Sequence, residues 1–174
     1  MGTGQSILTV FAMLLLSTLM LRVNGTLLNS GNVVTNSKLG LTAIALAQSR
    51  LEEIKSKAFD QNTVSATVSA TSSLTAASKL GPETGEVYPN FNDVDDFNGF
   101  TYTDTVQINP DLAKSATNCY YFKEIDSVVY VSSTSPDVTS SSQTWNKKIT
   151  VKITIPQMTD TIKVSTVFSY WVFR

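Results

Sequence analysis

The stretch ILTVFAMLLLSTLML at residues 7–21 contains no charged residue, and LGLTAIALAQSRLEEIKSK occupies residues 39–57. In the second stretch, apolar side chains recur mostly at steps of three and four residues, which is typical of an amphipathic helix. We therefore expect one helix of about 50 residues, roughly 75 Å long, that is apolar at first and amphipathic later. The apolar stripe of its second part is predicted to contain Leu41, Ile44, Ala45, Ala47, Leu51, Ile54 and Ala58.

The interval between these stretches is the weakest part of the predicted helix. It contains Gly25 and Gly31, and Gly40 follows closely. Each glycine costs up to about 1 kcal/mol relative to alanine in a helix interior. We expect residues 24–40 to bend, to unwind or to pack closely against neighbours.

The C-terminal part of the chain has the pattern of an antiparallel sheet. Four segments rich in β-branched and aromatic residues show alternating apolar and polar side chains; they are residues 100–108, 119–132, 145–155 and 161–173. The last two form the clearest hairpin. One apolar face needs a cover, which the helix at 39–59 can supply. The predicted class is α+β, a long helix followed by an antiparallel sheet of about four strands.

These patterns predict two parts. Residues 1–38 form an apolar N-terminal helix, acting as a filament core or a membrane span. Residues 39–174 form a globular head that contains helix 39–59, a Ser/Thr-rich connector and loop at 60–98, and the sheet at 99–174. The connector is either a carrier of O-glycans or an ordinary extended or coiled segment, and we favour the ordinary segment.

Composition excludes several function classes. The net charge of −1 gives no basic surface for nucleic acid, so no nucleic-acid contact is expected. The chain has no His, which removes the usual general base, and Cys119 is the single cysteine, so no internal disulfide can form. For Cys119 we favour a buried thiol over a reactive or intermolecular cysteine. We expect neither enzymatic activity nor a cofactor.

The apolar stretch is short for a membrane span. A span normally needs about 20 apolar residues, whereas here 15 residues separate Ser6 from Arg22. The preceding MGTGQS has no basic residue, which disfavours a cleaved secretory signal. Reversible residence in a bilayer is the prediction that fits this length.

The sequence LTAIALAQSRLEEIKSKAF at residues 41–59, downstream of an apolar helix, resembles type IV pilin-like proteins, especially minor pilins and pseudopilins. Gly4 lies where that family has its processing glycine. The chain diverges at Gln5, after that glycine, and at Thr9, where the family usually has a glutamate. The resemblance covers residues 4–60 and, beyond them, only the general plan of a helix followed by a sheet.

The resemblance implies a structural subunit of an extracellular, pilus-like filament of identical chains, held in the bacterial inner membrane before assembly. The alternatives are a single-span, membrane-anchored module whose head binds a surface, and a minor tip pilin with an adhesive role. Side chains of the apolar stretch would make the polymer contacts, and the candidates are Ile7, Leu8, Val10, Phe11, Leu14, Leu15, Leu16, Leu19 and Leu21.

The densest acidic cluster of the chain lies at residues 93–99. Asp93, Asp95, Asp96 and Asn98 offer oxygen ligands of the kind that calcium prefers. Their spacing differs from the standard calcium loop, and Asn98-Gly99 is a typical turn. We favour a turn with solvated aspartates and keep calcium as the weaker alternative.

Overall fold

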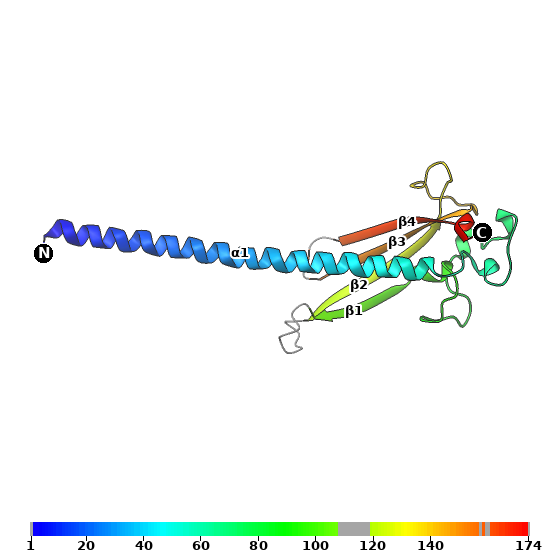
Figure 1. The fold of residues 1–174 in the computed structure, drawn as a ribbon, viewed down its shortest axis with the longest axis horizontal. Coiled ribbons are helices and arrows are strands. Elements are labelled where there is room, and N and C mark those ends of the chain that lie inside the picture. The colour runs from blue at the N-terminus through cyan, green and yellow to red at the C-terminus, as the bar shows by residue number, and fades with distance from the viewer. Residues whose placement is uncertain (1, 108–118, 157, 159–160, 174) are drawn as a thin grey trace. The chain divides into compact units, whose positions relative to one another are not determined.

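The computed structural model describes residues 2–107, 119–156, 158 and 161–173 (Figure 1). They form one long helix, α1 (Thr3–Lys55), and then a four-stranded antiparallel sheet, which confirms the predicted α+β class. The chain divides into two compact units, Met1–Leu39 and Gly40–Arg174. We call the first the N-terminal unit and the second the head.

Helix α1 continues unbroken through the glycine-containing interval. Its 53 residues include Gly25, Gly31 and Gly40, so the predicted unwinding at 24–40 does not occur. A glycine keeps both its amide donor and its carbonyl acceptor, so the hydrogen-bond ladder continues at an entropic cost. A Cβ added at any of the three would meet no atom within 4 Å, so close packing inside the chain does not require them.

The sheet consists of β1 (Thr101–Gln107), β2 (Cys119–Tyr130), β3 (Asn146–Thr154) and β4 (Thr161–Ser169), paired antiparallel in chain order. The β3–β4 pairing runs over nine residues of each strand, which confirms the hairpin predicted as the clearest. The last predicted strand was too long, because the chain turns into a 3-10 helix at Tyr170–Phe173. The predicted end of the first strand, Ile108, lies outside the described residues.

Alternate residues of the sheet face the core of the head. On β3, Ile149, Val151 and Ile153 are at most 1% exposed, whereas the intervening Lys152 is exposed. The part of α1 that belongs to the head runs along this face (Figure 1). It contributes the buried residues Ala43, Ala47, Leu51 and Ile54.

The predicted stripe of α1 is therefore partly wrong. Leu41 and Ile44 are 68% and 40% exposed, and Ala45 is exposed as well. The buried positions follow one another at steps of four, four and three residues, which places Leu41 and Ile44 on another side of the helix. The two alanines on the buried side let the sheet approach the helix closely. The larger Leu41 and Ile44 lie on another side of the helix and stay outside the core.

The connector after α1 forms short turns instead of a strand. Three 3-10 turns occur at Gln61–Thr63, Thr71–Ser73 and Ala77–Lys79, and another occupies Asp95–Phe97. The first is capped by Asp60, whose carboxylate accepts a hydrogen bond from Asn62 N. This cap anchors the connector beside the buried end of β3.

Candidate assembly surface and polar clusters of the head

The N-terminal unit presents apolar side chains on every side of its helix. All residues from Gly2 to Val34 are exposed. Successive residues of an α-helix are about 100° apart, so apolar residues distributed over 15 consecutive positions leave no polar face. An apolar surface of this extent is typical of contact with lipid or with another protein. The residues predicted for assembly are 55–73% exposed: Ile7, Leu8, Val10, Phe11, Leu14, Leu15, Leu16, Leu19 and Leu21.

The hydroxyl groups in this helix bond to the helix itself. Thr9 Oγ1 donates to Ser6 O at 2.9 Å, Ser17 Oγ donates to Met13 O at 2.9 Å, and Thr18 Oγ1 donates to Leu15 O at 2.9 Å. Such bonds from a side chain to the preceding turn satisfy a hydroxyl without water. The surface can therefore enter an apolar environment without leaving these donors unpaired.

The helix is long and apolar enough to cross a membrane. An 18-residue window within α1 has a mean hydropathy of 2.0, and none of that window is buried. Arg22 is the single charged residue between Met1 and Ser37, and its long side chain can reach a polar boundary. Length and composition thus permit a membrane anchor, a signal segment or a protein-contacting rod.

A buried charge cluster joins α1 to β2 in the head. Arg50 Nε donates to Glu124 Oε1 at 2.6 Å, and Arg50 Nη1 donates to Glu53 Oε2 at 2.6 Å. Three aromatic rings lie 5.1–5.5 Å from the guanidinium carbon, those of Tyr88, Phe100 and Tyr102. Members of this group other than Phe100 line a cavity of about 210 Å³. The arrangement fixes the helix on the sheet through charge-assisted bonds and cation–π contacts.

Asp126 lies next to this cluster without a good partner. It is 1% exposed, and neither of its oxygens accepts a hydrogen bond from a described residue. Arg50 Nε is 3.9 Å from its Oδ2. Burial, together with the charge of Glu124, raises the pKa of Asp126 to about 8. Near neutral pH this carboxyl therefore holds a proton in the folded chain.

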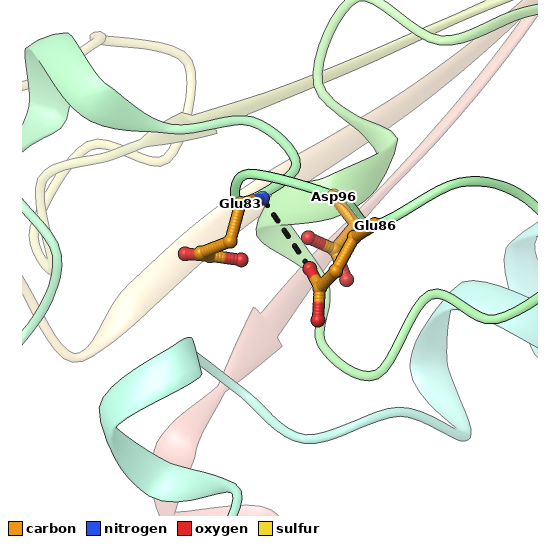
Figure 2. A group of neighbouring side chains, drawn as sticks. All are labelled: Glu83, Glu86 and Asp96. Carbon is orange, nitrogen blue, oxygen red and sulfur yellow. Dashed lines mark hydrogen bonds between the residues drawn. The ribbon is translucent and has the colours of Figure 1, made fainter.

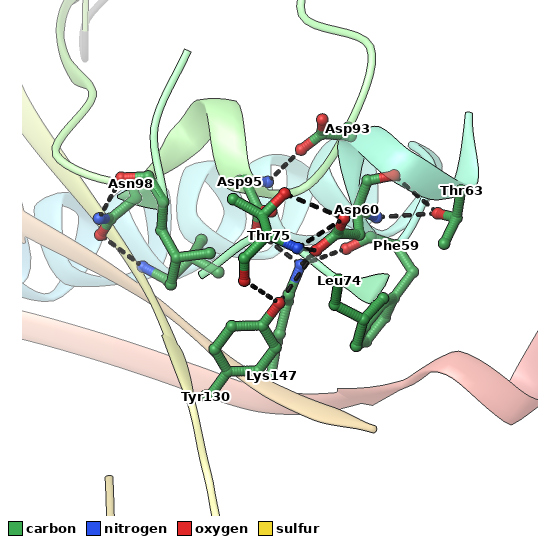
Figure 3. Close-up of polar contacts among 12 residues, drawn as sticks. Phe59, Asp60, Thr63, Leu74, Thr75, Asp93, Asp95, Asn98, Tyr130 and Lys147 are labelled. Atoms are coloured by element: carbon green, nitrogen blue, oxygen red, sulfur yellow. Dashed lines mark hydrogen bonds and ion pairs between the residues drawn. The ribbon is translucent and has the colours of Figure 1, made fainter. Parts of the chain in front are cut away.

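A second buried cluster surrounds Lys147, on β3 (Figure 3). The side chain is 0% exposed, and its ammonium donates to Phe59 O at 2.7 Å and to Asp60 Oδ2 at 2.9 Å. The ammonium also forms an ion pair with Asp95 Oδ1 at 2.7 Å. Three oxygens thus surround a group with three N–H bonds, and the Tyr130 ring lies 5.0 Å from the nitrogen.

The two aspartates of the lysine cluster are held differently. Burial raises the pKa of Asp60, but the charge of Lys147 and hydrogen bonds from Lys147, Thr75 and Asn62 outweigh it, so the net pKa is lowered. Burial raises the pKa of Asp95 to about 7, because Lys147 offsets it only in part and the charge of Asp60 adds to it. Asp60 is therefore the principal counter-ion of Lys147.

A third cluster consists of Glu83, Glu86 and Asp96, whose side chains lie close together (Figure 2). Glu86 N donates to Glu83 O at 3.0 Å, which closes a turn, and Gly85 within that turn has a φ of +94°. Asp96 approaches from the 3-10 turn at Asp95–Phe97. One carboxylate oxygen of each residue lies within 4.8 Å of the other two.

The oxygens of this acidic cluster are incompletely paired. Asp96 is 0% exposed, and its Oδ2 accepts hydrogen bonds from Asn92 N at 2.9 Å and Asp93 N at 3.1 Å. Its Oδ1 is buried and has no hydrogen-bond partner among the residues that the structure describes, and the same holds for Glu83 Oε2. Burial, a hydrogen bond with Glu86 and the charges of Asp93 and Asp96 raise the pKa of Glu83 to about 7.

The calcium candidates predicted from the sequence have separate roles. Asp95 pairs with Lys147, and Asp93 Oδ1 accepts a hydrogen bond from Asp95 N at 2.6 Å. Asn98 bridges two segments, since its Nδ2 donates to Leu80 O and its Oδ1 accepts from Val128 N. Of the four candidates, Asp96 alone faces Glu83 and Glu86.

The expectation of solvated aspartates is wrong. Asp93, Asp95 and Asp96 are each 0% exposed. Backbone amides and the ammonium of Lys147 hold these carboxylates inside the head, where a surface turn was expected. The expectation of a buried thiol is also inaccurate, because Cys119 at the start of β2 is partly exposed and free.

Sequence reasoning missed the lysine and arginine clusters, although strand alternation contains a signal for both. Lys147 has the same parity on β3 as the buried Ile149. Glu124 and Asp126 have the same parity on β2 as the buried Phe122. A charged residue in register with an apolar face predicts a buried partner. Glu83 and Glu86 give a weaker signal, because their approach to Asp96 depends on how the loop folds.

Comparisons of the chain with protein-family models, with curated proteins and with solved structures gave no match. The function is therefore inferred from the exposed surface and from the polar clusters of the molecule.

Proposed function

We propose that this chain is a structural subunit of an extracellular filament of the type IV pilin-like kind. Copies associate through their N-terminal helices, and their heads form the outside of the fibre. The observation that supports this most directly is the apolar surface of residues 7–21, exposed on every side of the helix. The order of a long apolar helix and a four-stranded antiparallel sheet is compatible with a pilin-like fold.

The apolar helix offers enough surface for a stable polymer. A large apolar side chain gains about 1.5–3 kcal/mol when it is removed from water, so burying those at residues 7–21 contributes on the order of 10–25 kcal/mol before entropy costs. A helix that is apolar on all sides needs several neighbours to cover it. Contacts between unlike surfaces that do not close into a ring generate a fibre with several neighbours for each copy.

The same properties support a membrane stage before assembly. The helix has the length and hydropathy of a span, and its hydroxyls are paired within the helix. In this proposal, the bacterial inner membrane stores the chain until it joins the filament, and the assembled product lies outside the cell. O-glycans on the Ser/Thr-rich connector are compatible with such a location, since residues 65–67 and 72–73 are exposed.

A second candidate is a single-span, membrane-anchored module whose head binds a surface or a partner, and a tip-located minor pilin stands between the two. The length and hydropathy of α1 favour this candidate equally, because they permit a permanent anchor. The two differ in what covers residues 7–21: copies of the same helix in one case, and lipid alone in the other.

Electron microscopy of the purified full chain after detergent removal separates these candidates. We expect helical fibres from the wild-type chain and none from Leu15→Lys, because a charge at a 56% exposed apolar position would be buried in the fibre. Val138→Lys is the matched control, since Val138 is 59% exposed on the head. Normal fibres from Leu15→Lys, or wild-type chains that stay dispersed without detergent, would contradict the proposal.

A further inference from the structure

Within the part of the chain that the structure describes, no ion pair involves the acidic cluster of Glu83, Glu86 and Asp96. Among the described residues, the ion pairs of the head involve other carboxylates, namely Glu52, Glu53, Asp60, Asp95, Glu124, Asp126 and Asp137. Three carboxylates in mutual contact repel one another unless a proton or a cation lies between them. The cluster is therefore either partly protonated or occupied by a cation.

The geometry fits a calcium ion. Calcium binds six to eight oxygens at about 2.3–2.6 Å, so two oxygens on opposite sides of one ion are roughly 4.6–5.2 Å apart. The three carboxylate oxygens of the cluster lie within 4.8 Å of one another, which one such ion can span. The partial exposure of Glu83 and Glu86 leaves one side open for water ligands.

The buried side of the cluster is set up to bind a cation. Asp96 is fully buried, and two backbone amides fix the orientation of its carboxylate through Oδ2. Its Oδ1 and Glu83 Oε2 are buried acceptors that receive no hydrogen bond from any described residue. An unpaired buried acceptor has a substantial energetic cost, and a cation removes that cost at both atoms together.

We propose that Glu83, Glu86 and Asp96 bind one calcium ion, which fastens the 83–86 turn to the 3-10 turn at Asp95–Phe97. Asn92 can supply a further oxygen ligand, because its Oδ1 is buried and accepts no hydrogen bond from a described residue. Its Nδ2 donates to Glu86, which holds the side chain beside the cluster. This site differs from the set of Asp93, Asp95, Asp96 and Asn98 suggested by the sequence. It shares Asp96 and takes its other ligands from the preceding turn.

Calcium binding can be measured by equilibrium dialysis on the full chain in mild detergent, after treatment with EGTA. We expect about one calcium per chain, with a dissociation constant in the range of about 10⁻⁵–10⁻³ M for an open site of this kind. The Glu83→Gln/Glu86→Gln variant should bind at least about tenfold more weakly, because it removes two of three charged ligands. Asp137→Asn is the control, since Asp137 is exposed on another loop.

A second measurement does not depend on a variant. Calcium should raise the thermal unfolding midpoint of the wild-type head, followed by tryptophan fluorescence, because a ligand of the folded state alone stabilises it. No bound calcium at 5 mM together with no shift in the midpoint would overturn the proposal. Equal binding by the double variant would place the ion elsewhere, and equal binding of Mg²⁺ would overturn the assignment to calcium.

This experiment is independent of the proposed filament. Detergent keeps the chains apart, so a failure to polymerise changes neither the stoichiometry nor the affinity. A failure to bind calcium would likewise leave the electron microscopy of fibres unaffected.

Discussion

Replacing the buried Lys147 by methionine should destabilise the head strongly. The substitution keeps a side chain of similar length and removes the ammonium that lies 2.9 Å from Asp60 Oδ2 and 2.7 Å from Asp95 Oδ1. Both carboxylates and the lysine are 0% exposed. Water therefore cannot replace the lost cation without opening the core.

The expected loss is about 3–5 kcal/mol, the usual cost of removing one partner from a buried ion pair. Asp60 keeps other donors, including Thr75 N at 3.0 Å and Tyr130 Oη at 2.9 Å, so its carboxylate remains partly solvated by the protein. Asp95 keeps no comparable support, because among the described residues none donates an aligned hydrogen bond to either of its oxygens.

The assay is thermal and urea unfolding of the full chain in mild detergent, followed by tryptophan fluorescence. Trp145 and Trp171 both belong to the head, so the signal reports that unit. A loss of about 3–5 kcal/mol corresponds to a fall in midpoint of roughly 10–20 °C for a domain of this size. Lys148→Met is the control: its ammonium pairs with the 94% exposed Asp137, and such a pair contributes only about 0–1 kcal/mol.

A double variant tests the assigned cause. Lys147→Met/Asp95→Asn should recover part of the stability that Lys147→Met loses, because it removes a buried carboxyl group that no longer faces the ammonium. Equal effects of Lys147→Met and Lys148→Met would refute the reasoning, as would a double variant less stable than Lys147→Met alone.

Three further predictions concern other parts of the molecule. The pKa of Asp126, about 8 in the folded chain beside Glu124, Arg50 and Glu53, lies above the ordinary value of an unfolded aspartate. Stability should therefore fall as the pH rises from about 4 to 8, by at most about 1.4 kcal/mol per pH unit from this group, and Asp126→Asn should flatten that slope in urea unfolding. Gly25→Ala should slow amide hydrogen exchange around residue 25 by roughly fivefold, because a Cβ there meets nothing and alanine gains about 1 kcal/mol in a helix; unchanged exchange would contradict this. Leu41→Lys should leave the thermal midpoint of the head within about 2 °C, since Leu41 is 68% exposed, whereas a large fall would mean that its side chain is packed.

The architecture was predictable because hydrophobic periodicity reports it directly. On β3, the alternation of Ile149, Thr150, Val151 and Lys152 predicts both the strand and its buried face. The long apolar stretch predicts a helix irrespective of its surroundings. Prediction was weaker where small residues form the contact surface, as at Ala43 and Ala47, because a hydropathy pattern gives more weight to the larger Leu41.

The polar clusters were not predictable to the same degree. Periodicity places Lys147 on the buried face, but the partner of a buried charge depends on a contact with Asp60, 87 positions earlier in the sequence. The acidic cluster forms where the 83–86 turn meets the 3-10 turn at Asp95–Phe97. The hydrophobic periodicity of the sequence does not indicate this contact. Local patterns therefore predict which face a residue occupies, whereas its chemical partner follows from the folded connector.

The internally bonded hydroxyls of α1 affect how the chain can change its surroundings. The hydroxyls of Thr9, Ser17 and Thr18 donate to carbonyl oxygens of the same helix. Moving the helix from lipid tails to neighbouring helices therefore breaks none of these hydrogen bonds. Lipid and protein are then almost equally good solvents for this surface, and hydrophobicity alone gives little preference between them. The direction of such a transfer would be decided by how closely the side chains pack against their neighbours. Small changes in side-chain shape at these positions would therefore matter more than changes in hydrophobicity.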